Sequence, residues 1–297
     1  MIDKLEMFIA LAREQHFGRA AEACNISQPS LSAAIKQLED QLGVQLVNRG
    51  SRYLGLTADG ERALVWARRI VADSRAMKAE IQTTKHGLSG RLRIAVIPTA
   101  TPMVHELTGP FSAQHPDVTF TVVARTSEQA LALLEGLEAD VAITYLDNEP
   151  LGNVTSLALY SERHRFLTAD PSLFAGRATL TWAEAASAPL CLLTPDMQNR
   201  RIINQHFARA GVSANVALES DSVFALYSHV LSGKWAAIMG EKPAEMFSQS
   251  GLMRAIPLVE PEIPFTVGLV VLPREPHTAL IDAFLRQARA YARKASV

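Results

Sequence analysis

The chain has 297 residues, of which 48% are hydrophobic and 20% are charged, and its formal net charge is −1; this composition predicts a globular protein with room for two or three domains. No apolar run is long enough to span a bilayer, and residues 1–6 lack the apolar core of a signal peptide, so we expect a cytoplasmic protein without a membrane partner. The two cysteines, Cys24 and Cys191, fall in different predicted domains, which argues against a disulfide framework and against a redox pair within one domain.

Two helical patterns open the chain. A first helix is predicted by apolar side chains that recur at helical spacing: Leu5, Phe8, Ile9 and Ala12. The Ala-rich segment 18–24 then predicts a short second helix, in which Ala20 and Ala21 are small enough for another helix to cross closely.

A third helix is predicted after the polar break at Asn25. Ser27 can cap it, and Pro29 is tolerated in a first turn because the amide it lacks would have no helical partner. One face is apolar, through Leu31, Ile35, Leu38 and Leu42. The opposite face has donors and small side chains that suit contact with phosphates and base edges, namely Ser30, Ser32, Ala33, Lys36 and Gln37. These features are typical of the recognition helix of a helix-turn-helix.

A β-hairpin wing is predicted next. Val44 with Leu46, and Leu54 with Leu56, alternate as in short strands around a turn at 48–51. Residues 1–90 contain 12 basic and 10 acidic residues, a net charge of +2, so bulk charge does not identify a DNA-binding protein. Phosphate binding would depend on where four basic side chains lie, although an ordinary solvated surface is the competing interpretation: Arg19, Lys36, Arg49 and Arg52.

A long helix is predicted from about residue 59 to His86. Thr57 can cap it, and Asp59 and Glu61 in its first turn have the charge that the helix dipole favours. Steps of four and three, as in a coiled-coil seam, connect Ala63, Ala67, Ile70, Ser74, Met77, Ile81 and Thr84. This seam predicts a homodimer; the alternative is an amphipathic helix packed on its own domain. Residues 87–90 are interpreted as a hinge.

From Arg91 onward the pattern becomes α/β. Strands are predicted at 91–97, 118–124, 141–146, 190–193, 235–239 and 266–272, separated by helical stretches. We therefore predict three parts: a DNA-binding domain (1–58), a linker helix with hinge (59–90) and an effector domain (91–297). The effector domain would have two lobes, 91–161 with 266–297 and 162–265, and a ligand between them at the carboxyl ends of strands.

Candidate ligand contacts lie in loops where a strand meets a helix N-terminus, a natural anion seat. They are Thr99, Ala100, Thr101, Thr126, Ser127, Thr144, Thr194, Met197, Gln198 and Asp221. The competing interpretation of these Ser and Thr residues is simple helix capping. Arg200 and Arg201 could balance an anionic ligand, or form a solvated helix face.

The chain resembles the LysR-type transcriptional regulators. The resemblance rests on residues that match in register over about 60 residues, namely Ala20–Ala21, Ser27–Ser32, Ile35, Gln37–Glu39, Leu42–Gly43, Leu46, Arg49, Leu56–Thr57 and Gly60. Val47, where the family usually has Phe, and the entry His16–Phe17–Gly18 are departures that we interpret as packing variation.

This resemblance implies a multidomain protein with a winged helix-turn-helix, a long linker helix and a two-lobed α/β effector domain like that of periplasmic binding proteins. Dimers would assemble into tetramers that bend double-stranded operator DNA, with RNA polymerase as a candidate partner. The implied DNA contacts are Arg19, Ser27, Gln28, Pro29, Ser30, Ser32, Ala33, Lys36, Arg49 and Arg52. The effector would be a small carboxylate. Residues 145–152 and 192–201 are similar to members found beside formate dehydrogenase operons, so formate is one candidate.

Other classes remain open from the residues alone. An enzyme or a solute-binding protein could use the same α/β lobes, and a nucleoid-type DNA-binding protein would need no effector. The sequence has no Gly-rich phosphate loop, zinc-type His-Glu spacing or nucleophile elbow, and His105–Glu106 is better interpreted as surface than as an acid-base pair. We therefore expect no catalytic activity, no cofactor and no metal.

Overall fold

The computed structural model describes residues 1–49, 53–274 and 276–295, with side chains throughout except at 49, 79–80, 82–86 and 295. The chain forms two compact units, Met1–Gly87 and Leu88–Val297. No helix among the described residues is both long and apolar enough to cross a membrane.

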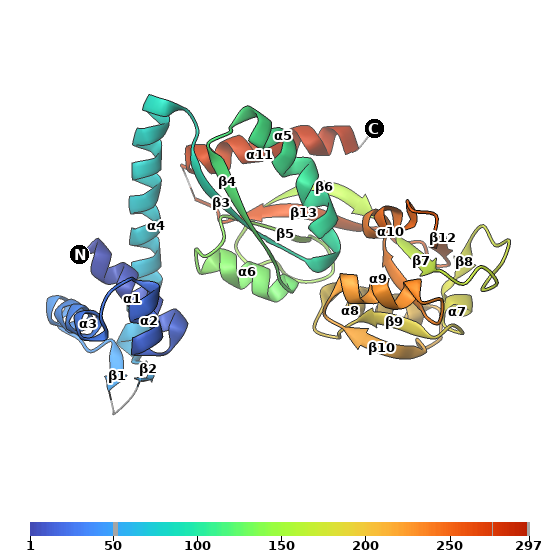
Figure 1. The fold of residues 1–297 in the computed structure, drawn as a ribbon, viewed down its shortest axis with the longest axis horizontal. Helices are drawn as coiled ribbons and strands as arrows, with labels where there is room; N and C mark the ends of the chain where they lie inside the picture. The colour runs from blue at the N-terminus through green and yellow to red at the C-terminus, as the bar shows by residue number, and fades with distance from the viewer. Residues whose placement is uncertain (50–52, 275, 296–297) are drawn as a thin grey trace. The chain divides into compact units, whose positions relative to one another are not determined.

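The first unit is a helical domain with a two-stranded hairpin (Figure 1). Its elements are α1 (Ile2–Glu14), α2 (Phe17–Ala23), α3 (Gln28–Leu42), β1 (Val47–Arg49), β2 (Tyr53–Leu56) and α4 (Ala58–His86). The three predicted helices, the wing and the long helix are thus all present. The core of this unit joins α1, α2, α3, the hairpin and the first half of α4.

Two details of the predicted packing are wrong. Leu42 does not belong to the buried face of α3, because it lies in the last turn and is 45% exposed, whereas Leu31, Ile35 and Leu38 are fully buried. Val44 is not in a strand: Gly43 ends α3 with a positive φ of 70°, Val44 is 38% exposed, and pairing begins only at Val47.

The predicted seam of α4 divides into two faces. Ala67 is buried and Ala63 is packed in the core of the same unit, so this part of the helix follows the alternative interpretation and covers its own domain. Ile70, Met77 and Ile81 are exposed, and they continue an apolar stripe that begins at Val65 and Trp66 rather than at Ala63. Thr84 lies outside the described side chains.

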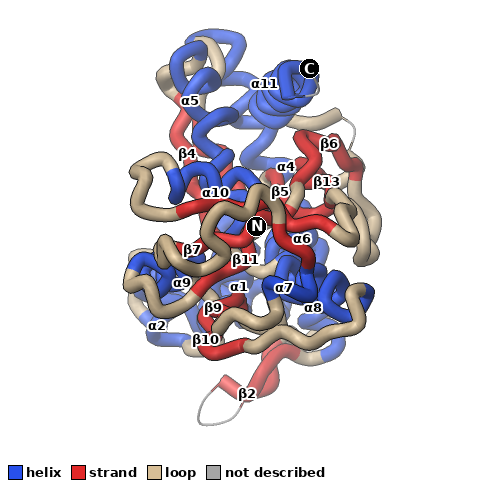
Figure 2. The backbone as a smooth tube through the Cα atoms, turned by 90° about the vertical axis from the view of Figure 1, so that its right-hand side faces the viewer, coloured by secondary structure: helices blue, strands red, loops and turns tan. Residues whose placement is uncertain are grey.

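The second unit consists of two α/β lobes, whose helices and strands are distinguished in Figure 2. The first lobe has a five-stranded sheet in the order β4-β3-β5-β13-β6, in which β3, β4 and β5 are parallel and β13 is antiparallel to both β5 and β6. Its elements are β3 (Gly90–Val96), the 3-10 helix η1 (Pro98–Met103), α5 (Val104–Gln114), β4 (Val118–Ala124), α6 (Ser127–Glu135), β5 (Val141–Tyr145), β6 (Thr155–Glu162), β13 (Phe265–Val271) and α11 (Ala279–Ala295).

The second lobe has a six-stranded sheet in the order β10-β9-β11-β7-β12-β8. Its elements are β7 (His164–Thr168), β8 (Leu180–Thr181), α7 (Trp182–Ala185), β9 (Leu190–Leu193), α8 (Gln198–Arg209), β10 (Val216–Ser220), α9 (Val223–Leu231), β11 (Ala236–Gly240), α10 (Glu241–Ser248) and β12 (Arg254–Val259). The chain passes between the two sheets twice, at Arg163 and at residues 260–264.

Both sheets are covered by helices on both faces, which is why β5, β9 and β11 are buried along their whole length. Along β3, Leu92, Ile94 and Val96 face the core that includes residues of α5 and α11, whereas Ala95 faces the one that includes residues of α6. In the second lobe, Leu190 and Leu192 of β9 pack with residues of α7 and α8, and the alternate positions pack with α9 and α10.

Candidate DNA-binding surface and effector pocket

Most of the side chains predicted to contact DNA lie at the start and on the outward face of α3, a helix that is capped at its N-terminus and buried along its apolar face. Ser27 is the N-cap: its hydroxyl accepts a hydrogen bond from the Ser30 amide at 3.3 Å and lies 2.8 Å from the Ser30 hydroxyl. Most of the predicted contact residues on this helix are exposed, and Ser32 is partly so; the exposed ones are Ser27, Gln28, Pro29, Ser30, Ala33 and Lys36. The apolar back of α3 is buried, so these side chains face solvent together.

Glu39 connects this helix to the wing. Its side chain is 8% exposed, and Oε1 accepts hydrogen bonds from the amides of Leu46 (2.9 Å) and Val47 (3.2 Å). The carboxylate thereby provides acceptors for two buried amides at the point where the chain leaves α3 and enters β1.

The start of α4 is joined to the same segment. Thr57 caps α4 as predicted, because its hydroxyl accepts from the Gly60 amide at 2.9 Å and also donates to the Gln45 carbonyl at 2.6 Å. Gly60 lies directly against the Leu46 carbonyl, where an added Cβ would overlap the backbone. Glu39 and Gly60 carried the family resemblance, and the structure gives each a physical reason.

Two of the four predicted phosphate-binding cations can be placed. Arg19 has a side chain that is 61% exposed and donates from Nη2 to the Glu14 carbonyl at 2.6 Å, which holds it near the start of α2. Lys36 is exposed on α3. The side chain of Arg49 and all of Arg52 lie outside the described residues.

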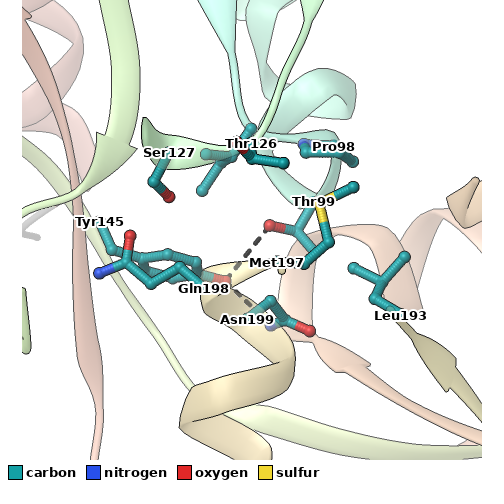
Figure 3. Close-up of a pocket in the computed structure, with 10 residues that line it drawn as sticks. Pro98, Thr99, Thr126, Ser127, Tyr145, Leu193, Met197, Gln198 and Asn199 are labelled. Atoms are coloured by element: carbon teal, nitrogen blue, oxygen red, sulfur yellow. Dashed lines mark hydrogen bonds between the residues drawn. The ribbon is translucent and has the colours of Figure 1, made fainter. Parts of the chain in front are cut away.

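A pocket lies between the two lobes of the second unit (Figure 3). From the first lobe it is lined at the carboxyl ends of β3, β4 and β5, and from the second at the end of β9 and the start of α8. The lining residues are Ile97, Pro98, Thr99, Thr126, Ser127, Tyr145, Leu193, Met197, Gln198 and Asn199. The space among these residues, counted together with the open solvent at its mouth, is about 200 Å³.

Half of the predicted ligand contacts line this pocket, namely Thr99, Thr126, Ser127, Met197 and Gln198. Ala100 and Thr144 are buried outside the lining, the Thr194 hydroxyl is buried elsewhere, and Thr101 and Asp221 are exposed. Asn199, the last residue of the predicted contact loop 193–199, also lines the pocket, and so does Tyr145, which the sequence analysis missed. No motif contains Tyr145. The signal that could have identified it is its position at the carboxyl end of the predicted strand 141–146, where ligand contacts were expected.

Several of the pocket's donors are free to bind an anion. The N-cap of α8 is Met197, which makes no side-chain capping hydrogen bond, so the first amides of this helix point toward the pocket without that acceptor. Ser127 is 5% exposed, and its buried hydroxyl has no hydrogen-bond partner among the described residues. Thr126, in contrast, caps α6 by accepting from the Gln129 amide at 3.2 Å, as the alternative interpretation expected.

The basic pair after the pocket does not line it. Arg200 is 6% exposed and donates to Glu219 Oε1 and to the Leu193 carbonyl, both at 2.7 Å. Arg201 forms a bidentate ion pair with Glu149 at 2.7 and 2.8 Å. The pair thus has a structural role, and within the described part of the chain all ten lining residues are uncharged.

Polar contacts join the two lobes at several points. The pair Arg201–Glu149 links α8 to the loop after β5, and the Lys242 ammonium lies 2.9 Å from Glu106 Oε1, which links α10 to α5. In addition, Asn199 Nδ2 donates to the Tyr145 hydroxyl at 3.0 Å. The arrangement of the lobes is therefore stabilised by specific contacts that a ligand could strengthen or weaken.

The Tyr145 hydroxyl is the centre of a buried hydrogen-bond network. It donates to Glu162 Oε2 at 2.7 Å and lies 3.2 Å from the Thr99 hydroxyl. Burial raises the pKa of Glu162 to about 7, although the hydrogen bond from Tyr145 partly opposes that shift. A carboxyl that titrates near neutrality thus lies one hydroxyl away from a pocket residue.

Two histidines are buried where the chain crosses between the lobes. His206 stacks on Trp182 with ring centroids 4.4 Å apart, and His164 meets it edge-on at 5.3 Å. His164 Nε2 and both ring nitrogens of His206 have no hydrogen-bond partner among the described residues. Burial lowers the pKa of His164 to about 3 and that of His206 to about 4, so both rings are neutral at pH 7.

The histidines predict acid-sensitive stability. Their pKa values in the folded protein lie below the ordinary 6.5, so their stabilising contribution is complete above pH 6.5 and is lost as the pH falls and the unfolded chain takes up protons. His206→Phe keeps the stacked ring and removes the titration. Between pH 7.5 and pH 5, the wild type should lose about 2 kcal/mol more of its free energy of unfolding than this variant, as measured by urea unfolding. Equal losses in the two proteins would contradict a buried neutral His206.

The two cysteines do not favour thiol chemistry. Cys191 is fully buried on β9, and burial raises the pKa of its thiol to about 11, so it has little thiolate at neutral pH. Cys24 belongs to the other unit and also has a raised thiol pKa, again through burial. Both raised pKa values make thiolate formation at neutral pH unfavourable.

A winged helix-turn-helix unit and a two-lobed unit with a pocket between its lobes together define a ligand-responsive transcriptional regulator. The family model described as "LysR substrate binding domain" matches residues 85–293, and "Bacterial regulatory helix-turn-helix protein, lysR family" matches residues 2–61. The chain therefore belongs to the LysR family of transcriptional regulators.

Known relatives and solved structures agree with this assignment. The DNA-binding transcriptional dual regulator OxyR of Escherichia coli K12 is 27% identical over 97% of this chain and 95% of its own. XapR of the same strain, an HTH-type transcriptional regulator, is 37% identical over 168 residues, 56% of each chain. These relatives are regulators, not enzymes. The fold is similar to that of full-length OxyR from Pseudomonas aeruginosa (TM-score 0.75, 24% identity, 97% of both chains) and of CbnR complexed with its target DNA (0.69, 19%, 98% and 99%).

Proposed function

We propose that this regulator binds operator DNA through α3 and the wing, and that a small carboxylate in the inter-lobe pocket changes this binding. The observation that carries the proposal is the pocket itself, where donors come from both lobes: the start of α8, which has no side-chain cap, and the Ser127 hydroxyl, which has no partner among the described residues. Formate is the smallest candidate of this class. The proposed effector contacts are Thr99, Ser127, Gln198 and Asn199.

Operator recognition would use the exposed face of α3. Gln28, Ser30, Ser32 and Lys36 supply donors and acceptors, and Ala33 permits close approach to base edges. Arg19 would contact phosphate from the start of α2. The CbnR structure, which contains the target DNA of that protein, supports the assignment of this module to DNA binding.

Self-association would use the exposed stripe of α4. Trp66, Ile70, Met77 and Ile81 are 63%, 41%, 57% and 57% exposed, and they recur at intervals of four, seven and four residues. A stripe of this length is typical of a helix that pairs with a second copy. We propose a homodimer through this stripe, which would double the DNA contacts, with a homotetramer as the larger assembly.

The effector would act by changing the equilibrium between lobe arrangements. The pocket is lined from both lobes, so a ligand that contacts Ser127 and the start of α8 together favours the arrangement that brings them close. Only this differential affinity can shift the equilibrium and hence the DNA contacts or the bend.

Peroxide sensing is the alternative suggested by relatives such as the "Hydrogen peroxide-inducible genes activator" of Escherichia coli O157:H7, 27% identical over 97% of this chain. A thiol sensor needs an accessible thiolate and a resolving cysteine. Cys191 is buried, has a raised pKa and is the only cysteine of its unit. We therefore favour a non-covalent effector.

The two functions should separate by mutation. Ser32→Ala and Lys36→Ala should each weaken operator binding about tenfold and leave effector binding unchanged, and Lys36→Ala should lower the salt slope of binding by about one. Arg286→Ala, which removes an exposed charge from α11 of the other unit, is the control for Lys36. Operator affinity equal to wild type in both α3 variants, measured by fluorescence anisotropy, would refute the DNA-binding face.

Thr99→Val should show the reverse behaviour. It removes a pocket hydroxyl and keeps the side-chain shape, so effector binding should weaken while operator affinity without effector stays the same. Thr101→Val is a matched control two residues away, because Thr101 is exposed on the same 3-10 helix and lies outside the pocket. If the two variants lost the response to effector equally, this pocket would not be the effector site.

A further inference from the structure

A continuous hydrogen-bond chain leads from the proposed effector pocket to a buried carboxyl. Thr99 lines the pocket, its hydroxyl lies 3.2 Å from that of Tyr145, and the Tyr145 hydroxyl lies 2.7 Å from Glu162 Oε2. Thr99, Tyr145 and Glu162 are 3%, 0% and 1% exposed. Figure 3 shows Thr99 and Asn199 both joined to the Tyr145 hydroxyl.

The charge of Glu162 determines which hydroxyl donates and which accepts at each hydrogen bond between Thr99, Tyr145 and Glu162. An ionised carboxylate can only accept, so the single hydroxyl hydrogen of Tyr145 must go to Glu162. The Tyr145 oxygen then accepts from Asn199 Nδ2 and from the Thr99 hydroxyl. In this state the hydroxyl hydrogen of Thr99 is directed at Tyr145 and away from the pocket. Toward a ligand, the Thr99 hydroxyl can then act only as a hydrogen-bond acceptor.

Protonation of Glu162 reverses the direction. The neutral carboxyl can donate to the Tyr145 oxygen, Tyr145 then donates to Thr99, and the hydrogen of Thr99 becomes available to a ligand. The same proton removes a buried negative charge near the pocket. Both changes favour a bound anion.

We propose that binding of a small anion in this pocket is coupled to the uptake of one proton by Glu162, so that the effector response depends on pH. This inference rests on the proposed function, since it requires an anionic ligand at Thr99. The proton comes from solvent and ends on the carboxyl; the hydrogens of Tyr145 and Thr99 reorient along their bonds to new acceptors.

The surroundings of Glu162 agree with titration near neutrality. Gly240 of β11 lies so close that a Cβ there would overlap the carboxylate, which leaves no room for water on that side. Burial raises the pKa of Glu162 to about 7, the hydrogen bond from Tyr145 and the charge of Lys242 lower it, and the charge of Glu241 raises it.

Two charged side chains near Glu162 are held in ion pairs with other residues. Glu241 is paired with Arg165 of β7, and Lys242 is paired with Glu106 of α5. Tyr160 of β6 has a raised pKa, through burial and then through the charge of Glu162, and stays neutral. Glu162 is the buried carboxyl of this cluster, and burial is what brings its pKa to about 7.

The first measurement needs no effector. Infrared titration of the full-length protein should detect the carbonyl stretch of a protonated carboxyl that disappears as the pH rises through about 7, and Glu162→Gln should lack it. Spectra of the two proteins that do not differ in this pH range would overturn the coupling whatever the ligand.

The second measurement is calorimetric titration with sodium formate and sodium acetate at pH 6 and pH 8, in two buffers of different ionisation enthalpy. Both acids stay ionised over this range. With one linked proton and a pKa of about 7, wild-type affinity should be about tenfold lower at pH 8, with uptake of up to one proton. Glu162→Gln should bind with nearly the same affinity at both pH values and take up no proton.

A matched control separates charge from proton coupling. Glu128→Gln removes an exposed carboxylate next to Ser127, so it should strengthen anion binding slightly at both pH values and keep the tenfold dependence. The same pH dependence in wild type and Glu162→Gln would overturn the coupling and leave the anion site intact. No binding of either acid at either pH would overturn the proposed anion site, and the coupling with it.

Discussion

Replacing Glu39 by alanine is expected to lower the free energy of unfolding of the DNA-binding unit by about 3 kcal/mol. The change removes the acceptor for the buried amides of Leu46 and Val47, and each unsatisfied buried donor destabilises by about 1–3 kcal/mol. The wing would also lose its link to α3, so operator binding should fall with stability. Hydrogen exchange of a peptide covering residues 44–48 measures the local opening directly.

Two variants test whether the acceptor itself is responsible. Glu39→Gln keeps an oxygen at the same place and should lose less than half as much stability. Asp40→Ala removes the neighbouring carboxylate, which is exposed, and should change little. If exchange of the wing segment were as slow in Glu39→Ala as in wild type, Glu39 would not hold the wing.

Replacing Tyr145 by phenylalanine is expected to have the largest effect in the effector unit. The variant leaves the buried carboxylate of Glu162 without its donor, and hydrogen bonds to charged groups contribute about 1.5–3 kcal/mol. The loss depends on pH: this bond lowers the pKa of Glu162, so the extra stabilisation that it gives to the ionised carboxylate is present above the wild-type pKa of about 7 and is lost as Glu162 becomes protonated. Urea unfolding should show a loss of about 3 kcal/mol at pH 8 and a smaller one at pH 6.

Tyr160→Phe is the matched control. The Tyr160 hydroxyl is buried without a hydrogen-bond partner among the described residues, so its removal should leave stability unchanged or slightly higher at both pH values. Equal losses in the two tyrosine variants would show that burial of a phenol, and not the bond to Glu162, determines the effect.

The DNA-binding unit could be predicted well because its signals are local. The cap at Ser27, the proline at Pro29 and the helical spacing of Leu31, Ile35 and Leu38 act within one helix, and the structure has each in place. The errors at Leu42 and in the seam of α4 arise where tertiary packing decides. Periodicity shows that a helix has an apolar face, but not whether that face covers its own domain, as at Ala67, or remains exposed, as at Met77.

The pocket could be predicted only in part. The ends of β3, β4, β5 and β9 were predicted to within one residue, and the loops that follow β3, β4 and β9 supply Thr99, Ser127 and Gln198 to the pocket. Thr101 does not line the pocket. It lies two residues after Thr99 in a 3-10 helix, where residues two positions apart lie on different sides of the helix. The choice of Thr144 in place of Tyr145 follows from the alternation of β5, where a shift of one residue changes the face.

Partners across the lobes were beyond local reasoning. Asn199 and Tyr145 meet across the pocket although they are 54 positions apart in the sequence. The same holds for Arg201, which pairs with Glu149. The spacing of residues in the sequence does not predict such contacts, because they depend on how the two lobes pack against each other.

The most direct test of the central claim, a DNA-binding regulator controlled by a small carboxylate, is a nuclease footprint of the full-length protein. The DNA should be sites that the protein recovers from genomic DNA of its source, including the region upstream of its own gene, at fixed salt. We expect a long protected region with hypersensitive bands that shift when one acid of a carboxylate panel, which includes formate, is added. Recovery of no site above nonspecific background would contradict the regulator assignment, and protection that no carboxylate alters would contradict the effector.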